Sequence, residues 1–273
     1  MPSGIAWTHC INRKNKMLTI KNLTIIVEEN ATTKKIVDNV SLSVPPETIV
    51  ALVGGSGSGK TTTGLAILRL LSPALKIERG EIIFENQDLL KSSEEHLRQL
   101  RGKKISMVFQ EPLNAFNPLF TIGYQIGEVL IYHTTMSLGE RGKKVLELLD
   151  IVGIPDPLRI VNSYPHQLSG GLRQRAMIAQ AIAGNPSLII ADEPTSNLDV
   201  TLQSHILELF RKLRQELELS ILLITHDLGV VSHLADEVTV LNQGQVVESG
   251  KTKSIVTQPR HPYTKELMET LKG

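Results

Sequence analysis

A glycine-rich loop between an apolar segment and a helix-like segment constrains this chain more than any other feature. Residues 51–64 are ALVGGSGSGKTTTG, with four glycines before one lysine. Glycine inside regular structure costs about 0.5–1 kcal/mol relative to alanine, so such a cluster needs a reason. Residues 54–61 fit the pattern G-x-x-x-x-G-K-[ST] at every fixed position, after a predicted strand and before a predicted helix.

The residue types of this loop match the needs of phosphate binding. Backbone N–H groups must meet phosphate oxygens at close range, where a Cβ would block the approach, and the helix N-terminus adds partial positive charge. Lys60 is expected to reach the β- and γ-phosphates, and the Thr61 hydroxyl to bind Mg²⁺. The alternative is a tight strand-to-helix turn that needs glycine only. The predicted nucleotide-binding residues are Gly54, Gly55, Ser56, Gly57, Ser58, Gly59, Lys60, Thr61 and Thr62.

Strand and helix patterns alternate along the chain. The run at 49–53 is apolar throughout, which is typical of a strand buried on both faces. Further strands are predicted at 18–27, 40–44, 81–84, 105–109, 187–191, 221–225, 238–241 and 245–248. Helices are predicted at 61–71, 121–132, 139–152, 172–183 and 202–217. This alternation predicts an α/β fold with a mainly parallel central sheet.

Two segments depart from this alternation. Residues 111–165 begin with proline and asparagine and continue with helical patterns, which predicts an inserted helical subdomain. Residues 1–16 precede the first strand pattern and lack the apolar core of a signal peptide, so a loose leader is expected there.

Composition excludes several classes of function. With 29 basic and 28 acidic residues the net charge is +1, which argues against a general nucleic-acid binder. The single cysteine, Cys10, cannot form a disulfide within the chain, and a reducing compartment is expected. No apolar run approaches the roughly 18 residues that a membrane-spanning helix needs.

Two adjacent carboxylates end the apolar segment SLIIADEP, residues 187–194. Asp192 at the strand tip suits a contact with Mg²⁺. Glu193 would point differently, toward a water beyond the γ-phosphate, from which a carboxylate can accept a proton. The alternative is an acidic helix start after the strand.

A second candidate anion site lies in HQLSGGLRQR, residues 166–175. Ser169 and two glycines precede a helix pattern, which is a further helix N-terminus able to bind an anion. One nucleotide site rarely needs two such cradles. The alternative is an ordinary N-cap with a flexible lead-in.

In their order, these motifs resemble those of ATP-binding-cassette (ABC) ATPases over about residues 18–270. Gln110 resembles the Q-loop glutamine, residues 196–199 with Asp199 the D-loop, and His226 the switch histidine. The signature motif is matched by Leu168, Ser169, Gly170 and Gly171, although Leu172 stands where glutamine is usual.

The resemblance implies a RecA-like P-loop core with an N-terminal antiparallel β subdomain and an inserted helical subdomain. It implies ATP and Mg²⁺ as cofactors, with Glu193, His226 and Gln110 as catalytic residues. Thr61, Gln110 and Asp192 are the implied Mg²⁺ contacts, and the signature motif would serve the ATP of a partner subunit.

A narrower resemblance covers ISMVFQEPLNAFNP (105–118) and QPRHPYTKELMETL (258–271), which look like the branch that powers oligopeptide, dipeptide and nickel importers. The short tail, without a cysteine-containing extension, tilts this expectation slightly toward nickel or metal chelates. The implied organisation is an ATPase domain at 17–250 and a C-terminal extension at 251–273.

The implied partners are a second ATPase subunit, identical or paralogous, and two transmembrane permease subunits. An extracytoplasmic substrate-binding protein would act indirectly, and no nucleic acid is expected. The implied place is the cytoplasmic face of the cell membrane.

One departure from the family concerns adenine, because residues 28–38 lack the aromatic that usually stacks on it. Two alternatives follow: weak selectivity for adenine, or an aliphatic such as Ile36 in place of the aromatic. Two rival functions stay open at this point: a soluble cassette protein acting on ribosomes or nucleic acid, and a small-molecule kinase that uses the same loop.

Overall fold

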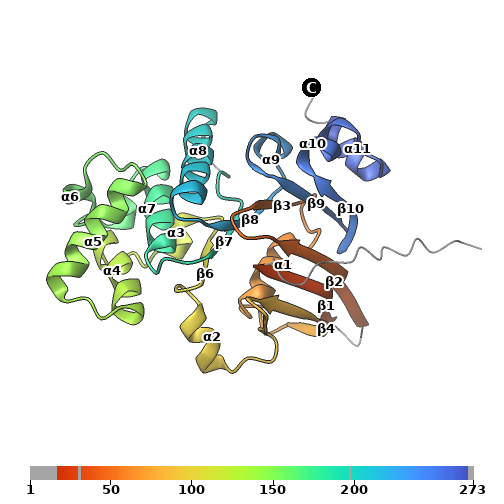
Figure 1. The fold of residues 1–273 in the computed structure, drawn as a ribbon, viewed down its shortest axis with the longest axis horizontal. Helices are drawn as coiled ribbons and strands as arrows, with labels where there is room; N and C mark the ends of the chain where they lie inside the picture. The colour runs from red at the N-terminus through yellow and green to blue at the C-terminus, as the bar shows by residue number, and fades with distance from the viewer. Residues whose placement is uncertain (1–16, 30–31, 197, 270–273) are drawn as a thin grey trace, which may run out of the picture.

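The computed structural model describes residues 17–29, 32–196 and 198–269 and contains two sheets (Figure 1). The larger sheet has the strand order β10-β9-β3-β8-β7-β6, in which only the β9–β10 pair is antiparallel. Its strands are β3 (Ile49–Val53), β6 (Ile105–Val108), β7 (Leu188–Asp192), β8 (Ser220–Thr225), β9 (Glu237–Asn242) and β10 (Gln245–Lys251). The predicted α/β fold with a mainly parallel central sheet is confirmed.

The central strands are apolar throughout because both faces of this sheet are covered. On β7, Ile189 and Ala191 pack into one hydrophobic cluster with helices α7 (Gly170–Ile182) and α8 (Val200–Glu216). The alternate residues Leu188 and Ile190 pack into another cluster, with helix α1 (Lys60–Ile67) and the second sheet. Helices α1 and α7 therefore lie on opposite faces of the central sheet.

The second sheet is antiparallel, with the order β2-β1-β4-β5. Its strands are β1 (Leu18–Glu29), β2 (Thr32–Val44), β4 (Leu75–Phe84) and β5 (Gln87–Asp88). The strands predicted at 40–44 and 81–84 are only the ends of β2 and β4. Their other halves carry exposed polar residues and become strands by pairing with β1, which is a tertiary effect that their own pattern does not reveal.

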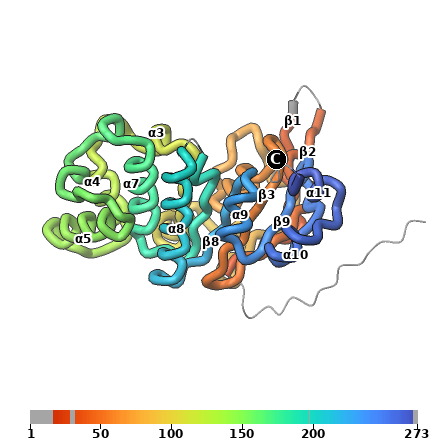
Figure 2. The backbone as a smooth tube through the Cα atoms, turned by 90° about the horizontal axis from the view of Figure 1, so that it is seen from above, coloured from red at the N-terminus to blue at the C-terminus, as the bar shows by residue number. Residues whose placement is uncertain are grey.

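A group of helices forms the end of the molecule opposite to the antiparallel sheet (Figures 1 and 2). It contains α3 (Pro112–Ala115), α4 (Ile122–His133), α5 (Leu138–Ile151), α6 (Pro157–Ile160) and η1 (Pro165–Gln167), packed with α7. The remaining helices are α2 (Glu94–Leu100), α9 (Leu228–Leu234), α10 (Thr252–Thr257) and α11 (Pro262–Glu269).

Some predicted boundaries shift for local reasons. Helix α1 ends at Ile67 rather than residue 71, because Arg69 adopts a positive φ of 52°. Helix α7 begins at Gly170, since Ser169 caps it, and α8 begins at Val200, since Asp199 caps it. Among the described residues, no helix has both the length and the apolar character that crossing a bilayer requires.

Candidate active site

The loop between β3 and α1 has the form of an anion cradle. Gly57 and Gly59 have φ values of 73° and 98°, and a Cβ on Gly59 would lie 2.7 Å from the carbonyl oxygen of Ile36. Gly59 is the N-cap of α1 and supplies no capping side chain. The first backbone N–H groups of α1 therefore have no side-chain acceptor, as an anion-binding helix N-terminus requires. Ser56 is exposed at the loop, and Thr62 is half-buried in the first turn of α1.

Lys60 places a buried cation inside this loop. Its Nζ donates to the carbonyl oxygens of Gly54 and Gly55 at 2.8 and 2.9 Å. Burial lowers the pKa of the Lys60 ammonium, and the carboxylates of Glu193 and Asp192 oppose that effect. An ammonium hydrogen-bonded to two carbonyl oxygens can exchange them for phosphate oxygens.

Asp192 and Thr61 meet across the sheet edge. The Thr61 hydroxyl donates to Asp192 Oδ1 at 3.1 Å. Asp192 is 3% exposed, and burial raises the pKa of its carboxyl to about 6. Carboxylate and hydroxyl oxygens are the hard donors that Mg²⁺ prefers, so this pair fits the ion.

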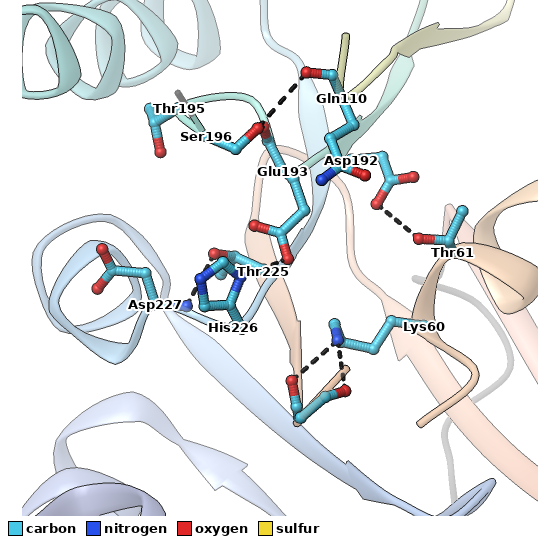
Figure 3. A network of polar contacts seen from close by, with 12 residues as sticks. Lys60, Thr61, Gln110, Asp192, Glu193, Thr195, Ser196, Thr225, His226 and Asp227 are labelled. Atoms are coloured by element: carbon cyan, nitrogen blue, oxygen red, sulfur yellow. Dashed lines mark hydrogen bonds and ion pairs between the residues drawn. The ribbon is translucent and has the colours of Figure 1, made fainter. Parts of the chain in front are cut away.

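Glu193 faces a different partner because its backbone turns. It has a positive φ of 46°, and its N–H donates to the carbonyl oxygen of Ile224 on β8 at 2.8 Å. Glu193 Oε1 lies 2.7 Å from His226 Nδ1, at the end of β8 (Figure 3). The two adjacent carboxylates thus separate, one toward α1 and one toward β8.

Gln110 follows β6 on the same edge of the sheet, and it is exposed. The Ser196 hydroxyl donates to the carbonyl oxygens of Glu193 at 2.9 Å and Gln110 at 3.5 Å. Figure 3 shows the Gln110 side chain directed toward the Asp192 side of the site. The structure therefore brings together the loop, Asp192, Glu193, His226 and Gln110.

The signature residues do not join this cluster. Ser169 caps α7 by accepting from the N–H of Leu172 at 3.4 Å, and it is exposed together with Gly170. Leu168 is buried, and a Cβ on Gly171 would meet Leu202 of α8 at 3.2 Å. These residues lie at the N-terminus of α7, on the face of the central sheet opposite to α1.

The D-loop segment continues on the same side as α7. Asp199 is exposed and caps α8, with its Oδ1 accepting from the N–H of Leu202 at 2.9 Å. Asn197, which the resemblance also included, lies outside the described residues, as do residues 1–16.

Two sets of contacts around the site are not predictable from the motifs of the sequence. Gln203 Nε2 donates to Asp227 Oδ2 at 3.1 Å and to the Thr195 hydroxyl at 3.3 Å, which links α8 to both segments that carry the acidic and histidine residues. Asp227 in turn caps α9. Tyr263 accepts a hydrogen bond from Gly55 in the loop. Of these contacts, only the capping of α9 by Asp227 could have been predicted from the sequence, because an aspartate just before a helix is a typical N-cap.

A phosphate loop after β3, a buried lysine and two divergent carboxylates at the end of β7 define a P-loop nucleotide hydrolase. Comparison with known proteins agrees, since residues 37–196 match the family model described as ABC transporter. The chain belongs to the ABC transporter family, as an ATP-binding subunit whose ATP hydrolysis is coupled to transport.

Curated relatives extend the similarity over nearly the whole chain. The dipeptide transport ATP-binding protein DppD of Bacillus subtilis is 46% identical over 254 residues, which cover 93% of this chain and 76% of that protein. The oligopeptide transport ATP-binding protein OppD of Bacillus subtilis is 45% identical over 260 residues, covering 95% of this chain and 73% of that protein. The chain therefore falls in the peptide-importer branch of the family.

Solved structures share the fold. The ATP-binding cassette MJ0796, solved as a dimer bound to ADP and Pi, superposes with a TM-score of 0.78 at 32% identity, covering 86% of this chain and 99% of that one. The cassette cbiO1 of Clostridium perfringens gives a TM-score of 0.77 at 25% identity, covering 94% of this chain and all (100%) of that one.

Proposed function

We propose that this chain hydrolyses ATP to power peptide uptake through a membrane importer. The proposal of ATP hydrolysis rests on one observation. Beside the Lys60 loop, the Asp192 carboxylate contacts Thr61, whereas the Glu193 carboxylate contacts His226. The cargo follows from the identity to dipeptide and oligopeptide transport proteins over more than nine-tenths of the chain. This similarity favours peptides over nickel or metal chelates.

The phosphate loop and the adjacent carboxylates of Asp192 and Glu193 fit ATP together with Mg²⁺. Thr61 and Asp192 would hold the ion, with Gln110 as a further oxygen donor. When bound, Mg²⁺ supplies positive charge that offsets the charge of the β- and γ-phosphates. Lys60 adds a second positive charge from the loop side, where its ammonium leaves the carbonyl oxygens of Gly54 and Gly55 for phosphate oxygens.

Glu193 serves as the general base. Its carboxylate accepts a proton from the attacking water, and His226 at 2.7 Å fixes the carboxylate in position. The side chain of His226 is 65% exposed, so it also meets groups that approach from outside the chain. Ser196 ties the backbone of Glu193 to that of Gln110, which would report the state of the site to the helical segment.

A second ATPase subunit completes the site. Ser169, Gly170 and the neighbouring signature residues lie at the N-terminus of α7, across the central sheet from α1. One chain cannot close both cradles on a single nucleotide in this arrangement. We infer that the exposed Ser169–Gly170 corner binds the ATP held by the loop of a second copy or a paralogue.

The surface after Gln110 suits a membrane subunit. Leu113, Leu119, Phe120 and Tyr124 are exposed, with Leu119 at 78%. Gln125 holds this surface in shape, since its amide donates to the carbonyl oxygens of Asn117 and Phe120 at 3.0 Å. A rigid, apolar, exposed surface next to the active-site edge supports contact with the two permease subunits. The chain would then work at the cytoplasmic face of the membrane, with a substrate-binding protein acting through the permease.

We also propose an ATPase domain at 17–250 and a C-terminal extension at 251–273, which contains α10 and α11. Helices α3 to α6 fall within 111–165, the proposed helical subdomain.

The decisive experiment measures ATP turnover of the purified chain against protein concentration, with Lys60→Ala as the inactive control. Specific activity should rise steeply with concentration, because two subunits form each site, and should rise further in vesicles with the permease and peptide-loaded binding protein. The control should lose ATP binding by calorimetry. A concentration-independent phosphoryl transfer to a small molecule would instead identify a kinase, and stimulation by RNA or ribosomes a soluble cassette protein.

A further inference from the structure

The C-terminal helix contacts the nucleotide site directly. We propose that Tyr263 of α11 is a positioning residue for the phosphate loop and that it raises the affinity of the loop for ATP. The inference rests on the proposed nucleotide site and adds to it a residue 208 positions away from the loop glycine that it contacts.

The contact is made to one peptide unit of the loop. The N–H of Gly55 donates to the Tyr263 hydroxyl at 2.8 Å. The carbonyl of the same peptide unit belongs to Gly54, and it accepts from Lys60 Nζ at 2.8 Å. The N–H and C=O of a trans peptide point in opposite directions, and the described residues contain no cis peptide. Tyr263 and Lys60 therefore hold this unit from its two sides, so that Tyr263 sets the orientation of the carbonyl on which the lysine rests.

Packing on β3 keeps Tyr263 in place. Met268 of α11 and Ile255 of α10 are buried in one cluster with Ala51 and Val53 of β3, the strand that leads into the loop. Tyr263 itself packs against that cluster. Helix α11 and the loop are thus both anchored on β3, and this packing keeps the Tyr263 hydroxyl next to the loop.

Glu248 of β10 fixes the start of α11. Its carboxylate accepts from the backbone N–H groups of Arg260 and His261, both at 3.0 Å. The N–H of Tyr263 donates to His261 Nδ1 at 3.2 Å. These bonds set the position of the Tyr263 backbone before its side chain reaches the loop.

The expected effect of the hydroxyl is on binding rather than on the chemical step. Without it, the Gly55 N–H loses its acceptor and the peptide unit gains freedom that nucleotide binding must remove. The loss of one hydrogen bond corresponds to roughly 2–10-fold in a binding constant. The carboxylate of Glu193 and the ring of His226 have no described hydrogen bond to Tyr263, so the rate at saturating ATP should change less than about twofold.

The test compares full-length Tyr263→Phe with the wild-type chain and with Tyr132→Phe, a control at a side chain that is 75% exposed on α4. Calorimetry gives the Kd for ATP, steady-state kinetics gives KM and kcat, and thermal unfolding gives Tm. We expect Kd and KM to rise about 2–10-fold in Tyr263→Phe, with kcat and Tm near wild type, and no change in the control.

A second comparison uses the space around Gly55, where a Cβ would lie 3.0 Å from the Tyr263 hydroxyl. Gly55→Ala should weaken ATP binding more in the wild-type background than in Tyr263→Phe, where the hydroxyl no longer obstructs the methyl group. Unchanged Kd and KM in Tyr263→Phe, a fall in kcat alone, or additive effects of the two changes would overturn the inference. Failure of the wild-type chain to bind ATP would overturn the proposed site itself, which separates the two results.

Discussion

The backbone dihedral of Glu193 directs two adjacent carboxylates toward different partners. A non-glycine residue in the left-handed region costs about 1–2 kcal/mol, and Glu193 has a φ of 46° at the tip of β7. This turn sends its carboxylate to His226, while the carboxylate of Asp192 remains with Thr61. The fold tolerates the strain at the position where the proposed base and the proposed metal-binding group must differ in direction.

Glu193→Gln should slow ATP hydrolysis by about 10²–10⁴-fold, the range expected on loss of a general base. Glutamine keeps the shape and can still bond to His226, so ATP affinity should persist. The variant should accumulate as an ATP-bound dimer, visible by size-exclusion chromatography with ATP and Mg²⁺. Glu208→Gln, on the exposed side of α8, is the matched control and should behave as wild type. Near-normal turnover of Glu193→Gln would assign the base to another group.

Asp192 predicts a pH dependence of stability in the nucleotide-free protein. Burial raises the pKa of its carboxyl from an ordinary 3.8 to about 6. Between these values the folded chain binds more protons than the unfolded chain, so its free energy of unfolding falls as pH rises through this window. Above pH 6 the buried carboxylate destabilises the fold by up to roughly 3 kcal/mol.

Asp192→Asn should therefore raise the Tm at pH 8 in EDTA without nucleotide, by a few degrees. Asparagine can still accept the Thr61 hydrogen bond, and the gain should shrink as pH falls toward 4. Calorimetric scans from pH 4 to 8 measure this, with Asp156→Asn on the exposed start of α6 as the control. An equal loss of stability at every pH would contradict the assignment. The same variant should lose Mg²⁺-dependent turnover.

At the scale of elements, the placement of α1 and α7 on opposite faces of the central sheet separates the two candidate anion-binding helix N-termini. Both helices begin at the carboxyl edge of the sheet, because α1 follows β3 and α7 runs into β7. Of these two helices, α1 begins without a side-chain cap, whereas Ser169 caps α7. We propose that the N-terminus of α1 binds the ATP of its own chain, and that the exposed Ser169–Gly170 corner binds the ATP of a partner.

Ser169→Arg should leave ATP binding by the isolated chain within about twofold of wild type, yet abolish turnover, because the arginine blocks the partner's nucleotide. Loss of the N-cap itself costs about 1 kcal/mol. Ser137→Arg removes the corresponding cap of α5 in the same helical group and controls for that cost. Binding by calorimetry and turnover at high protein concentration test the pair. A parallel fall of both in Ser169→Arg would refute the two-subunit site.

At the scale of the whole molecule, the segment after Gln110 is expected to meet the membrane subunit. Although this segment is rich in proline and asparagine, residues Pro112–Ala115 form a helical turn, since Pro112 occupies the first turn, where its missing N–H costs nothing. Gln125 fixes the rest by bonds to Asn117 and Phe120.

Cysteines at Asn114 and Asn117, in a Cys10→Ser background, should crosslink to a permease subunit in the assembled transporter. Ser232→Cys, exposed on α9, should not. Crosslinking is scored on gels, and spin labels at the same positions report mobility. Free mobility of both labelled positions in the complex would place the membrane contact elsewhere on the molecule.

The sequence by itself determined the features that local chemistry imposes. The apolar strands of the central sheet are buried on both faces, so their runs stand out without any tertiary information. The loop glycines, Lys60 and the acidic pair follow from what phosphate and its counter-charges need, and the family resemblance supplied the order of the remaining motifs. The helix starts after the N-caps Ser169 and Asp199 were within reach of capping rules, although both predicted starts lay two residues late.

Tertiary structure alone decided the long-range contacts. The polar halves of β2 and β4 become strands only through pairing with β1. The direction of the Glu193 side chain depends on the hydrogen bond between its backbone N–H and Ile224. The hydrogen bond from Gln203 to Asp227 joins two helices whose sequence patterns give no sign of the contact. Tyr263 reaches Gly55 because α11 packs on β3. Such contacts join residues far apart along the chain, so no local periodicity or propensity encodes them, and only the packed fold brings them within bonding distance.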